Sequence, residues 1–156
     1  MGKNYFPLFI DLTGRRVLVV GGGAVAERRV RALLPFGCSL TVVAPAVSPG
    51  ILELADQKKI RLEQREYREG DEDGCALVLA ATNDRAVNHT VVRQAAQAGA
   101  FYNAADCKEE CNFFFPGIAM GSGITAGVTA NGRDHRLARR ATERIRTLLE
   151  AFAREE

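Results

Sequence analysis

The sequence lacks several features that would place the protein at a membrane or in a repeat architecture. No apolar run approaches the roughly 18 residues that a membrane span requires, and residues 1–7 lack the apolar core of a signal peptide. There is no internal repeat and no low-complexity segment, which excludes solenoids and linkers. The 156 residues, 47% of them hydrophobic, suffice for one domain with a real core. We therefore expect a soluble, cytoplasmic protein with no membrane partner.

Cysteine and histidine are too few and too scattered to indicate a metal site or a disulfide framework. The four cysteines lack paired C-x-x-C spacing, and a chain with an adequate core does not need disulfides. Cys107 and Cys111 lie four residues apart, but two thiols alone do not complete a metal site. His89 and His135 match no metal motif, and His89 is expected on the surface of its helix. The sequence thus predicts reduced thiols and no bound metal.

The most informative stretch is a run of three glycines between an apolar strand and a helix. Gly21, Gly23 and Ala26 follow the G-x-G-x-x-A spacing of a dinucleotide-binding turn. Gly21 permits the tight turn, Gly23 lets the backbone approach a pyrophosphate, and Ala26 allows close helix packing. The helix N-terminus, at Ala24 and Val25, offers unpaired N–H groups to the phosphates. The alternative is a glycine turn that binds nothing.

Strand and helix patterns alternate up to residue 106. Continuous apolar runs predict buried parallel strands at residues 16–20, 39–44, 60–65, 75–82 and 101–104, with 8–12 as an edge piece or lead-in. Helices are expected over residues 24–36, 49–55 and 85–99; Ser48 or Pro49 should open the second, and Asp84 should cap the third. In the first helix, Val25 should face the sheet and Arg29 the solvent. The fold class predicted is α/β, a Rossmann-like sheet of order 3-2-1-4-5.

Ligands of such folds bind at the carboxyl ends of the strands. Thr82 and Asn83 follow the fourth predicted strand, and Asn103 and Asp106 lie at or after the end of the fifth. We expect these four residues at the same edge of the sheet as the glycine turn.

The end of the second predicted strand lacks an expected residue. Many NAD-binding domains carry an Asp or Glu there, which binds the ribose hydroxyls, but this chain has Ala44 and Pro45. There is also no adjacent arginine for the 2′-phosphate of NADP. Both residues are expected to contact the cofactor, and NAD is modestly favoured over NADP.

After residue 106 the pattern changes. Residues 112–120 and 123–130 are β-like, with a glycine turn between them, and predict an antiparallel extension that packs on the core or on a second subunit. A final helix over residues 135–153 is expected with Asp134 as N-cap and an apolar stripe at Leu137, Ala141, Ile145, Leu148 and Leu149. We therefore expect an NAD-binding domain at 1–106 and a dimerisation or substrate region at 107–156.

The C-terminal segment is strongly basic. Six arginines face only two acids, Asp134 and Glu143, so the segment carries a local net charge of +4; the arginines are Arg133, Arg136, Arg139, Arg140, Arg144 and Arg146. This cluster favours an anionic partner. A solvated basic helix face is an equally weighted alternative.

Several of these motifs together resemble one known family. They are residues 17–29, Ala44-Pro45, residues 80–84, Val87-Asn88, residues 103–106 and residues 111–116. In order and spacing they resemble the dehydrogenase/ferrochelatase part of siroheme synthase, which also occurs as a single-domain precorrin-2 dehydrogenase. The resemblance implies an NAD-dependent oxidation of precorrin-2 to sirohydrochlorin and a homodimer. Some relatives also insert ferrous iron into the product.

The resemblance also implies roles for individual residues. The family's aspartate, proposed to act in proton removal and in metal insertion, lies in an Asn-Val-x-Asp run that Asn103–Asp106 matches. The match implies that Asp106 is the catalytic residue and that Asn103 binds the substrate. The alternative is that Asp106 caps the turn after its strand. Arg133 and Arg139 suit a substrate with eight carboxylates.

The chain departs from the family in two places. Asn131–His135 replaces a Gly-Gly-x-Ser-Pro run, and the relatives continue with a further helical region, so a smaller pocket or one completed by a partner subunit is expected. An NAD-sensing regulatory domain without catalysis is the main rival. Nucleic-acid binding through the basic helix is weaker, and no nucleic-acid partner is expected.

Overall fold

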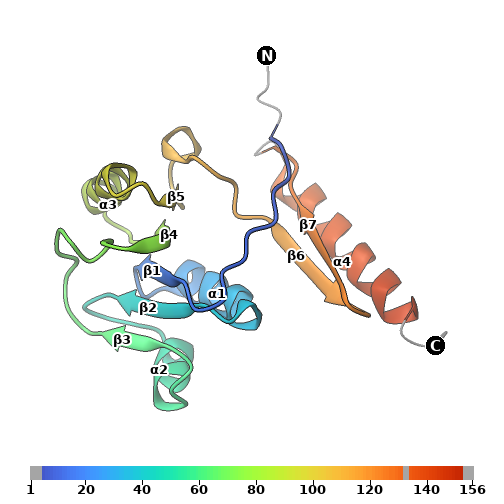
Figure 1. Ribbon diagram of the computed structural model, residues 1–156, viewed down its shortest axis with the longest axis horizontal. Helices are drawn as coiled ribbons and strands as arrows, with labels where there is room; N and C mark the ends of the chain where they lie inside the picture. Colours follow the sequence, from blue (N-terminus) through green and yellow to red (C-terminus); the bar gives the residue numbers. More distant parts are fainter. Residues whose placement is uncertain (1–4, 132–133, 153–156) are drawn as a thin grey trace. The chain divides into compact units, whose positions relative to one another are not determined.

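A five-stranded parallel sheet forms the centre of the first part of the chain (Figure 1). The computed structural model describes residues 5–131 and 134–152. The strands run in the order β3-β2-β1-β4-β5 and are β1 (Arg16–Val20), β2 (Ser39–Val43), β3 (Arg61–Glu63), β4 (Cys75–Ala80) and β5 (Phe101–Ala104). All neighbours pair in parallel, which confirms the predicted Rossmann-like topology.

Helices connect the strands at the predicted places. They are α1 (Ala24–Leu33), followed by the 3-10 helix η1 (Leu34–Phe36), then α2 (Pro49–Asp56) and α3 (Arg85–Gln97). Ser48 caps α2 by accepting a hydrogen bond from the backbone N–H of Ile51, and Asp84 caps α3 through two backbone N–H groups. The predicted Asp84 cap is confirmed, and of the two residues expected to open α2, Ser48 is the cap and Pro49 the first helical residue. Residues 8–12 form no strand, so this segment is a lead-in and not an edge strand.

The core covers both faces of the sheet. Leu18 and Val20 of β1 cluster with Val78 and Ala80 of β4 and with a buried face of α3 formed by Val91, Val92 and Ala95. The alternate residues Val17 and Val19 point to the opposite face and are equally buried. Continuous apolar strands of this kind are what a parallel sheet with both faces covered requires.

Two expectations about α1 are wrong. The helix buries Ala26, Val30 and Leu33, whereas Val25 is 37% exposed. Val25 is the second residue of the helix, in its first turn, and is not among the residues that the helix buries. Arg29 was expected in water but is half-buried, because the loop after β5 comes close to this side chain at Cys111.

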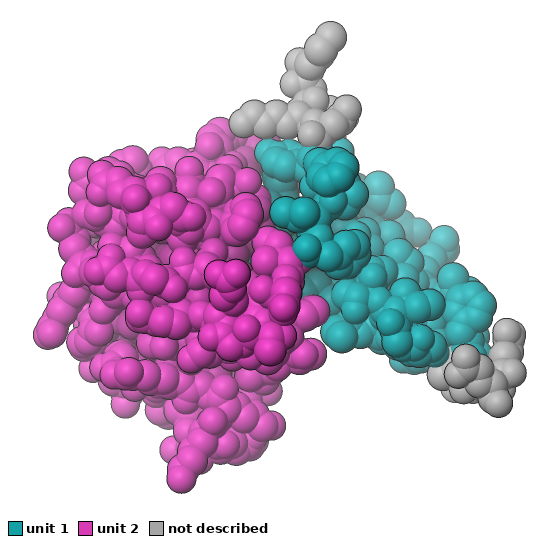
Figure 2. Space-filling view, in the orientation of Figure 1, with its two compact units in different colours: residues 1–9, 114–156 teal, residues 10–113 magenta. Residues whose placement is uncertain are grey.

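The chain divides into two compact units, which Figure 2 shows in different colours: Ile10–Phe113, and Met1–Phe9 together with Phe114–Glu156. In the second unit β6 (Gly117–Gly121) and β7 (Ile124–Val128) form an antiparallel hairpin, and α4 (His135–Phe152) packs on it. The helix lies so close that a Cβ at Gly117 would come within 2.3 Å of the Thr142 hydroxyl. The predicted β extension and final helix are therefore confirmed.

The expected apolar stripe on α4 is only partly correct. Asp134 caps the helix through the Leu137 N–H at 2.9 Å, as expected. Thr142 and Leu149 are buried against the hairpin, but Leu137 and Leu148 are each 55% exposed. The reason is that two short strands can cover only one side of a helix. In residues 5–131 and 134–152, no helix combines the length and apolarity needed to cross a membrane.

Candidate active site

The first two glycines of the glycine turn are required by close backbone packing. Gly21 has a φ of +125°, and a Cβ there would lie 2.3 Å from the carbonyl oxygen of Ala81. A Cβ at Gly22 would lie 2.1 Å from the carbonyl oxygen of Ala46. A Cβ at Gly23 would meet nothing within 4 Å. The turn therefore packs against its neighbours on one side and leaves open space at Gly23.

The open side of the turn is the N-terminus of α1. Gly23 is the N-cap, has extended backbone and makes no side-chain cap hydrogen bond. The first intrahelical bond runs from Glu27 N–H to the Gly23 carbonyl at 3.0 Å, which leaves the preceding N–H groups of the first turn without intrahelical partners. Ala24 and Val25, two of the predicted cofactor contacts, are exposed here. The geometry suits an anion, because these N–H groups and the helix dipole both carry partial positive charge.

The turn after β2 is joined to the glycine turn. Ala44 is buried and Pro45 is exposed. Three residues on, the Ser48 N–H donates to the Gly22 carbonyl at 2.8 Å, and the Ser48 hydroxyl donates to Glu27 Oε2 at 2.6 Å. The hydrogen bonds from Ser48 and Arg31 lower the pKa of Glu27. A carboxylate thus lies beside this turn although the sequence has none at the end of the strand; it comes from α1.

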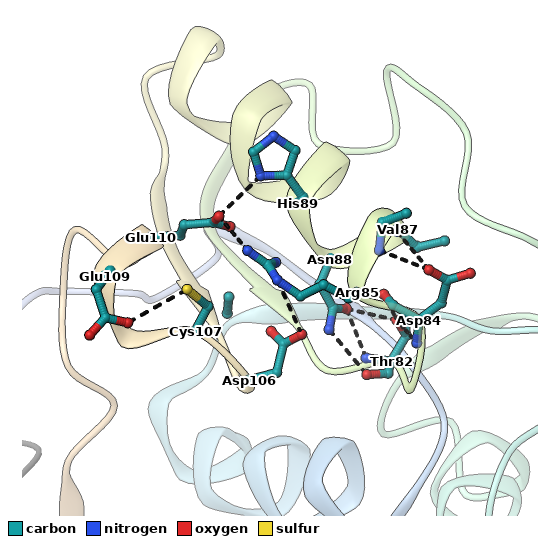
Figure 3. Close-up of polar contacts among 12 residues, drawn as sticks. Thr82, Asp84, Arg85, Val87, Asn88, His89, Asp106, Cys107, Glu109 and Glu110 are labelled. Carbon is teal, nitrogen blue, oxygen red and sulfur yellow. Dashed lines mark hydrogen bonds and ion pairs between the residues drawn. The ribbon is translucent and has the colours of Figure 1, made fainter.

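A buried amide holds the segment after β4 (Figure 3). Asn88 of α3 is fully buried, and its Oδ1 accepts hydrogen bonds from the Thr82 N–H at 3.0 Å and the Thr82 hydroxyl at 2.7 Å. Its Nδ2 donates to the Thr82 carbonyl at 3.1 Å. The predicted contact residues Thr82 and Asn83 are half-buried and exposed, respectively. The sequence motif contained Asn88, but sequence reasoning gave it no role.

The end of β5 presents an unsatisfied acceptor and a carboxylate. Asn103 is 5% exposed, and its Nδ2 donates to the Phe113 carbonyl at 2.9 Å. Its Oδ1 is buried and has no hydrogen-bond partner among the described residues, a costly state unless a ligand supplies a donor. The Asp106 side chain is 33% exposed, with Oδ2 3.9 Å from Arg85 Nε. Both predicted residues therefore lie at the carboxyl edge of the sheet, with free accepting capacity.

Asp106 belongs to a small network of charged side chains that sequence reasoning missed. Arg85, at the start of α3, forms an ion pair with Glu110 of the 3-10 helix η2 (Lys108–Glu110), as Figure 3 shows. His89 Nδ1 lies 3.1 Å from the same Glu110 oxygen. The hydrogen bond from Arg85, together with His89, lowers the pKa of Glu110, and Glu110 in turn raises the pKa of Arg85. His89 is exposed, as predicted, but it is not isolated.

The Cys111 thiol holds the loop after β5. Cys111 Sγ lies 3.2 Å from the Ala104 N–H and 3.2 Å from the Cys107 carbonyl. Burial raises the pKa of Cys111. Burial also lowers the pKa of Arg29 to about 10, an effect that the neighbouring Cys111 opposes. No set of three potential ligands for a metal ion occurs in the described part of the chain, and all four cysteines are free.

Of the two predicted substrate arginines, Arg139 belongs to the second unit. Arg139 is exposed on α4, and Arg133 lies outside the described residues. The guanidinium of Arg146 already has protein partners: it forms an ion pair with Glu143 at 2.8 Å and donates a hydrogen bond to the Ile118 carbonyl at 2.9 Å. The structure thus brings together the glycine turn, Thr82, Asn103 and Asp106 within Ile10–Phe113, whereas Arg139 is part of the second unit.

Comparisons with known proteins find similarity over nearly the whole chain. A family model described as "Putative NAD(P)-binding" matches residues 8–117. The solved structure titled SirC, precorrin-2 dehydrogenase is similar with a TM-score of 0.77 and 31% identity, covering 92% of this chain and 70% of that chain.

Two sequence relatives are much longer than this chain. The protein named "Probable multifunctional siroheme biosynthesis protein HemA" of Ruminiclostridium josui is 45% identical over 147 residues, which is 94% of this chain and 28% of the relative. Siroheme synthase of Methylococcus capsulatus is 39% identical over 146 residues, which is 94% of this chain and 31% of the relative. The chain therefore spans less than a third of these relatives.

Proposed function

Because the chain belongs to the family of precorrin-2 dehydrogenase and the N-terminal dehydrogenase domain of siroheme synthase, we propose that it oxidises precorrin-2 to sirohydrochlorin with NAD. The observation that carries this proposal is the shared edge of the sheet. The carboxyl ends of β1, β4 and β5 bring the open glycine turn, Thr82 and Asp106 to one side of the parallel sheet. Ligands of such folds bind there.

The glycine turn fits the cofactor. The open space at Gly23 and the uncapped first turn of α1 leave room and N–H donors for a pyrophosphate, so we assign this part to Gly21, Gly23, Ala24 and Val25. Ala44 and Pro45 would line the adenosine side, and Thr82 and Asn83 the path toward the nicotinamide. When bound, NAD supplies the acceptor for the hydride that leaves the substrate.

We assign to Asp106 the acceptance of the proton that the substrate loses. Oxidation of precorrin-2 removes one hydride and one proton, and a carboxylate with an exposed oxygen can accept that proton and release it to water. Asn103 would bind the substrate, because its buried Oδ1 lacks a donor that a pyrrole N–H can supply. In this assignment the chain's own side chains orient the substrate and handle the proton.

The second unit is assigned to the substrate and to a second subunit. A tetrapyrrole with eight carboxylates needs several cationic partners, for which Arg133 and Arg139 are proposed. Met120 and Ile124 of the hairpin are 43% and 47% exposed, which fits a homodimer interface. We propose a cytoplasmic homodimer in which residues 1–106 bind NAD and residues 107–156 provide the dimer and substrate region.

A turnover assay tests the function directly. The purified chain with precorrin-2 and NAD should produce NADH, Asp106→Asn should abolish most of the rate, and Asp56→Asn, an exposed acid at the end of α2, should not. Repeating the assay with Fe²⁺ shows whether iron is inserted as well. NAD binding by calorimetry without any turnover would instead support a regulatory sensor.

A further inference from the structure

Arg85 occupies a position where a cation is normally unfavourable. It is the first residue of α3, and the partial positive charge of a helix N-terminus disfavours Lys and Arg there. The structure supplies the compensation from the loop after β5, which places the carboxylates of Glu110 and Asp106 around the guanidinium (Figure 3).

The two carboxylates share Arg85 unequally. Arg85 Nη2 makes a direct hydrogen bond to Glu110, whereas Arg85 Nε lies 3.9 Å from Asp106 Oδ2, beyond hydrogen-bonding distance. Glu110 is itself held by His89 at 3.1 Å. Asp106 therefore experiences the positive charge of Arg85, while its oxygens are not occupied by a direct hydrogen bond from it.

Such an arrangement suits a group that must accept a proton. A bidentate arginine clamp would occupy both carboxylate oxygens and strongly favour the ionised form, which would make a poor proton acceptor. With no cation nearby, no charged partner would hold the carboxylate in position. An arginine whose charge is largely committed to another acid lies between these limits.

Several other titratable groups lie on the elements around Asp106. The loop and η2 bring Cys107, Lys108, Glu109, Glu110 and Cys111; Glu109 accepts a hydrogen bond from Cys107, and Asp106 has an electrostatic effect on Cys111. From α3 come Arg85 and His89. From α1, Arg29 faces Cys111. Arg85 is the cation of this set that forms a direct ion pair with Asp106.

We propose that Arg85 is a positioning residue for Asp106, and that Glu110, supported by His89, sets how much of the Arg85 charge reaches Asp106. The proposal rests on the proposed function, in which Asp106 accepts the proton. It makes one unusual requirement: removal of Arg85 and removal of the Glu110 charge must act on Asp106 in opposite directions. If both variants simply disordered the loop after β5, their effects on Asp106 would not have opposite signs.

The test follows the Asp106 carboxyl by carbon NMR titration, with Asp106→Asn to assign its resonance. Arg85→Gln removes a cation, so the titration midpoint should move up by about 0.5 pH unit, the size expected for a partly exposed pair. Glu110→Gln removes an anion and releases Arg85 toward Asp106, so the midpoint should move down by a similar amount. The acid limb of the kcat/KM profile should move in the same two directions.

Matched controls come from the same elements. Glu109→Gln changes the same charge on η2 at a side chain that is 71% exposed, and Arg93→Gln removes an exposed arginine of α3; neither should move the midpoint. Shifts of the same sign in Arg85→Gln and Glu110→Gln, or no shift in either, would overturn the proposal. The NMR readout needs no turnover, so an active Asp106→Asn enzyme would refute the assigned role of Asp106 and leave the measured coupling intact.

Discussion

Gly23→Asp should weaken cofactor binding without destabilising the fold. The structure places no protein atom where the new side chain would begin. Gly23 has φ −85° and ψ −169°, a conformation that any residue adopts, and its Cβ would meet nothing within 4 Å. As the N-cap of α1, Asp would accept hydrogen bonds from first-turn N–H groups, which is worth a few tenths of a kcal/mol relative to Gly. The fold should therefore be at least as stable as the wild type.

The same carboxylate should strongly oppose a pyrophosphate. Two unit charges about 5 Å apart at an effective dielectric constant of about 20 repel by about 3 kcal/mol, which corresponds to about a hundredfold increase in Kd for NAD. The aspartate would also occupy N–H groups that the phosphates need. Both effects weaken binding of the ligand, whereas in the apo protein the same hydrogen bonds stabilise the N-terminus of α1.

Calorimetric titration with NAD and a thermal melt measure the two quantities separately. Gly23→Ala is the uncharged control and should weaken binding less. Gly22→Ala is the opposite control, since its Cβ would lie 2.1 Å from the Ala46 carbonyl oxygen and should lower the Tm. An unchanged Kd in a well-folded Gly23→Asp protein would refute the assignment of the cofactor to this turn.

Three further outcomes are expected. Asn88→Ala should lower the free energy of unfolding, measured in urea, by about 2 kcal/mol, because it leaves buried polar groups of Thr82 without hydrogen-bond partners. A change within error would contradict a stabilising role of the Asn88–Thr82 hydrogen bonds. Asn103→Leu should raise KM for precorrin-2 about tenfold with a smaller effect on KM for NAD, since the buried acceptor is lost, and equal effects on both would remove Asn103 from the substrate site. The lowered pKa of Glu110 means that its pairing stabilises the fold above the ordinary carboxyl pKa of 4.5 and that this contribution is lost as the pH falls through the lowered value. The stability difference between wild type and Glu110→Gln should therefore vanish in acid, and a difference that persisted there would have another cause.

The parallel fold was predictable because its signals are local. Apolar runs, the glycine turn and the capping residues Ser48 and Asp84 each act over a few neighbouring positions, and the strand order then followed from the handedness of the connections. The burial of Arg29 was not predictable, because it depends on a loop some 80 residues further along the chain.

The candidate site was predictable in its strand-end residues but not in the groups that support them. Asp106 and Asn103 stood out in the motif, whereas the Ser48–Glu27 bond joins residues 21 apart and the Arg85–Glu110 pair joins residues 25 apart. No periodicity connects such positions, because tertiary packing alone brings them together. The exposed Leu137 and Leu148 of α4 illustrate the same limit, since a helix pattern does not state how wide its partner surface is.

The burial of Ala44 has a practical consequence for any attempt to change the dinucleotide preference of this NAD(P)-binding fold. An acid placed there to imitate other NAD-binding domains would put a charge at a position that is 4% exposed, next to the backbone of β3. The free energy of unfolding of such a variant should fall, and this loss of stability would obscure any change in its cofactor preference. Redesign toward either dinucleotide should instead begin at Pro45 and Ala46, whose exposed side chains can accept a new charged group without entering the core.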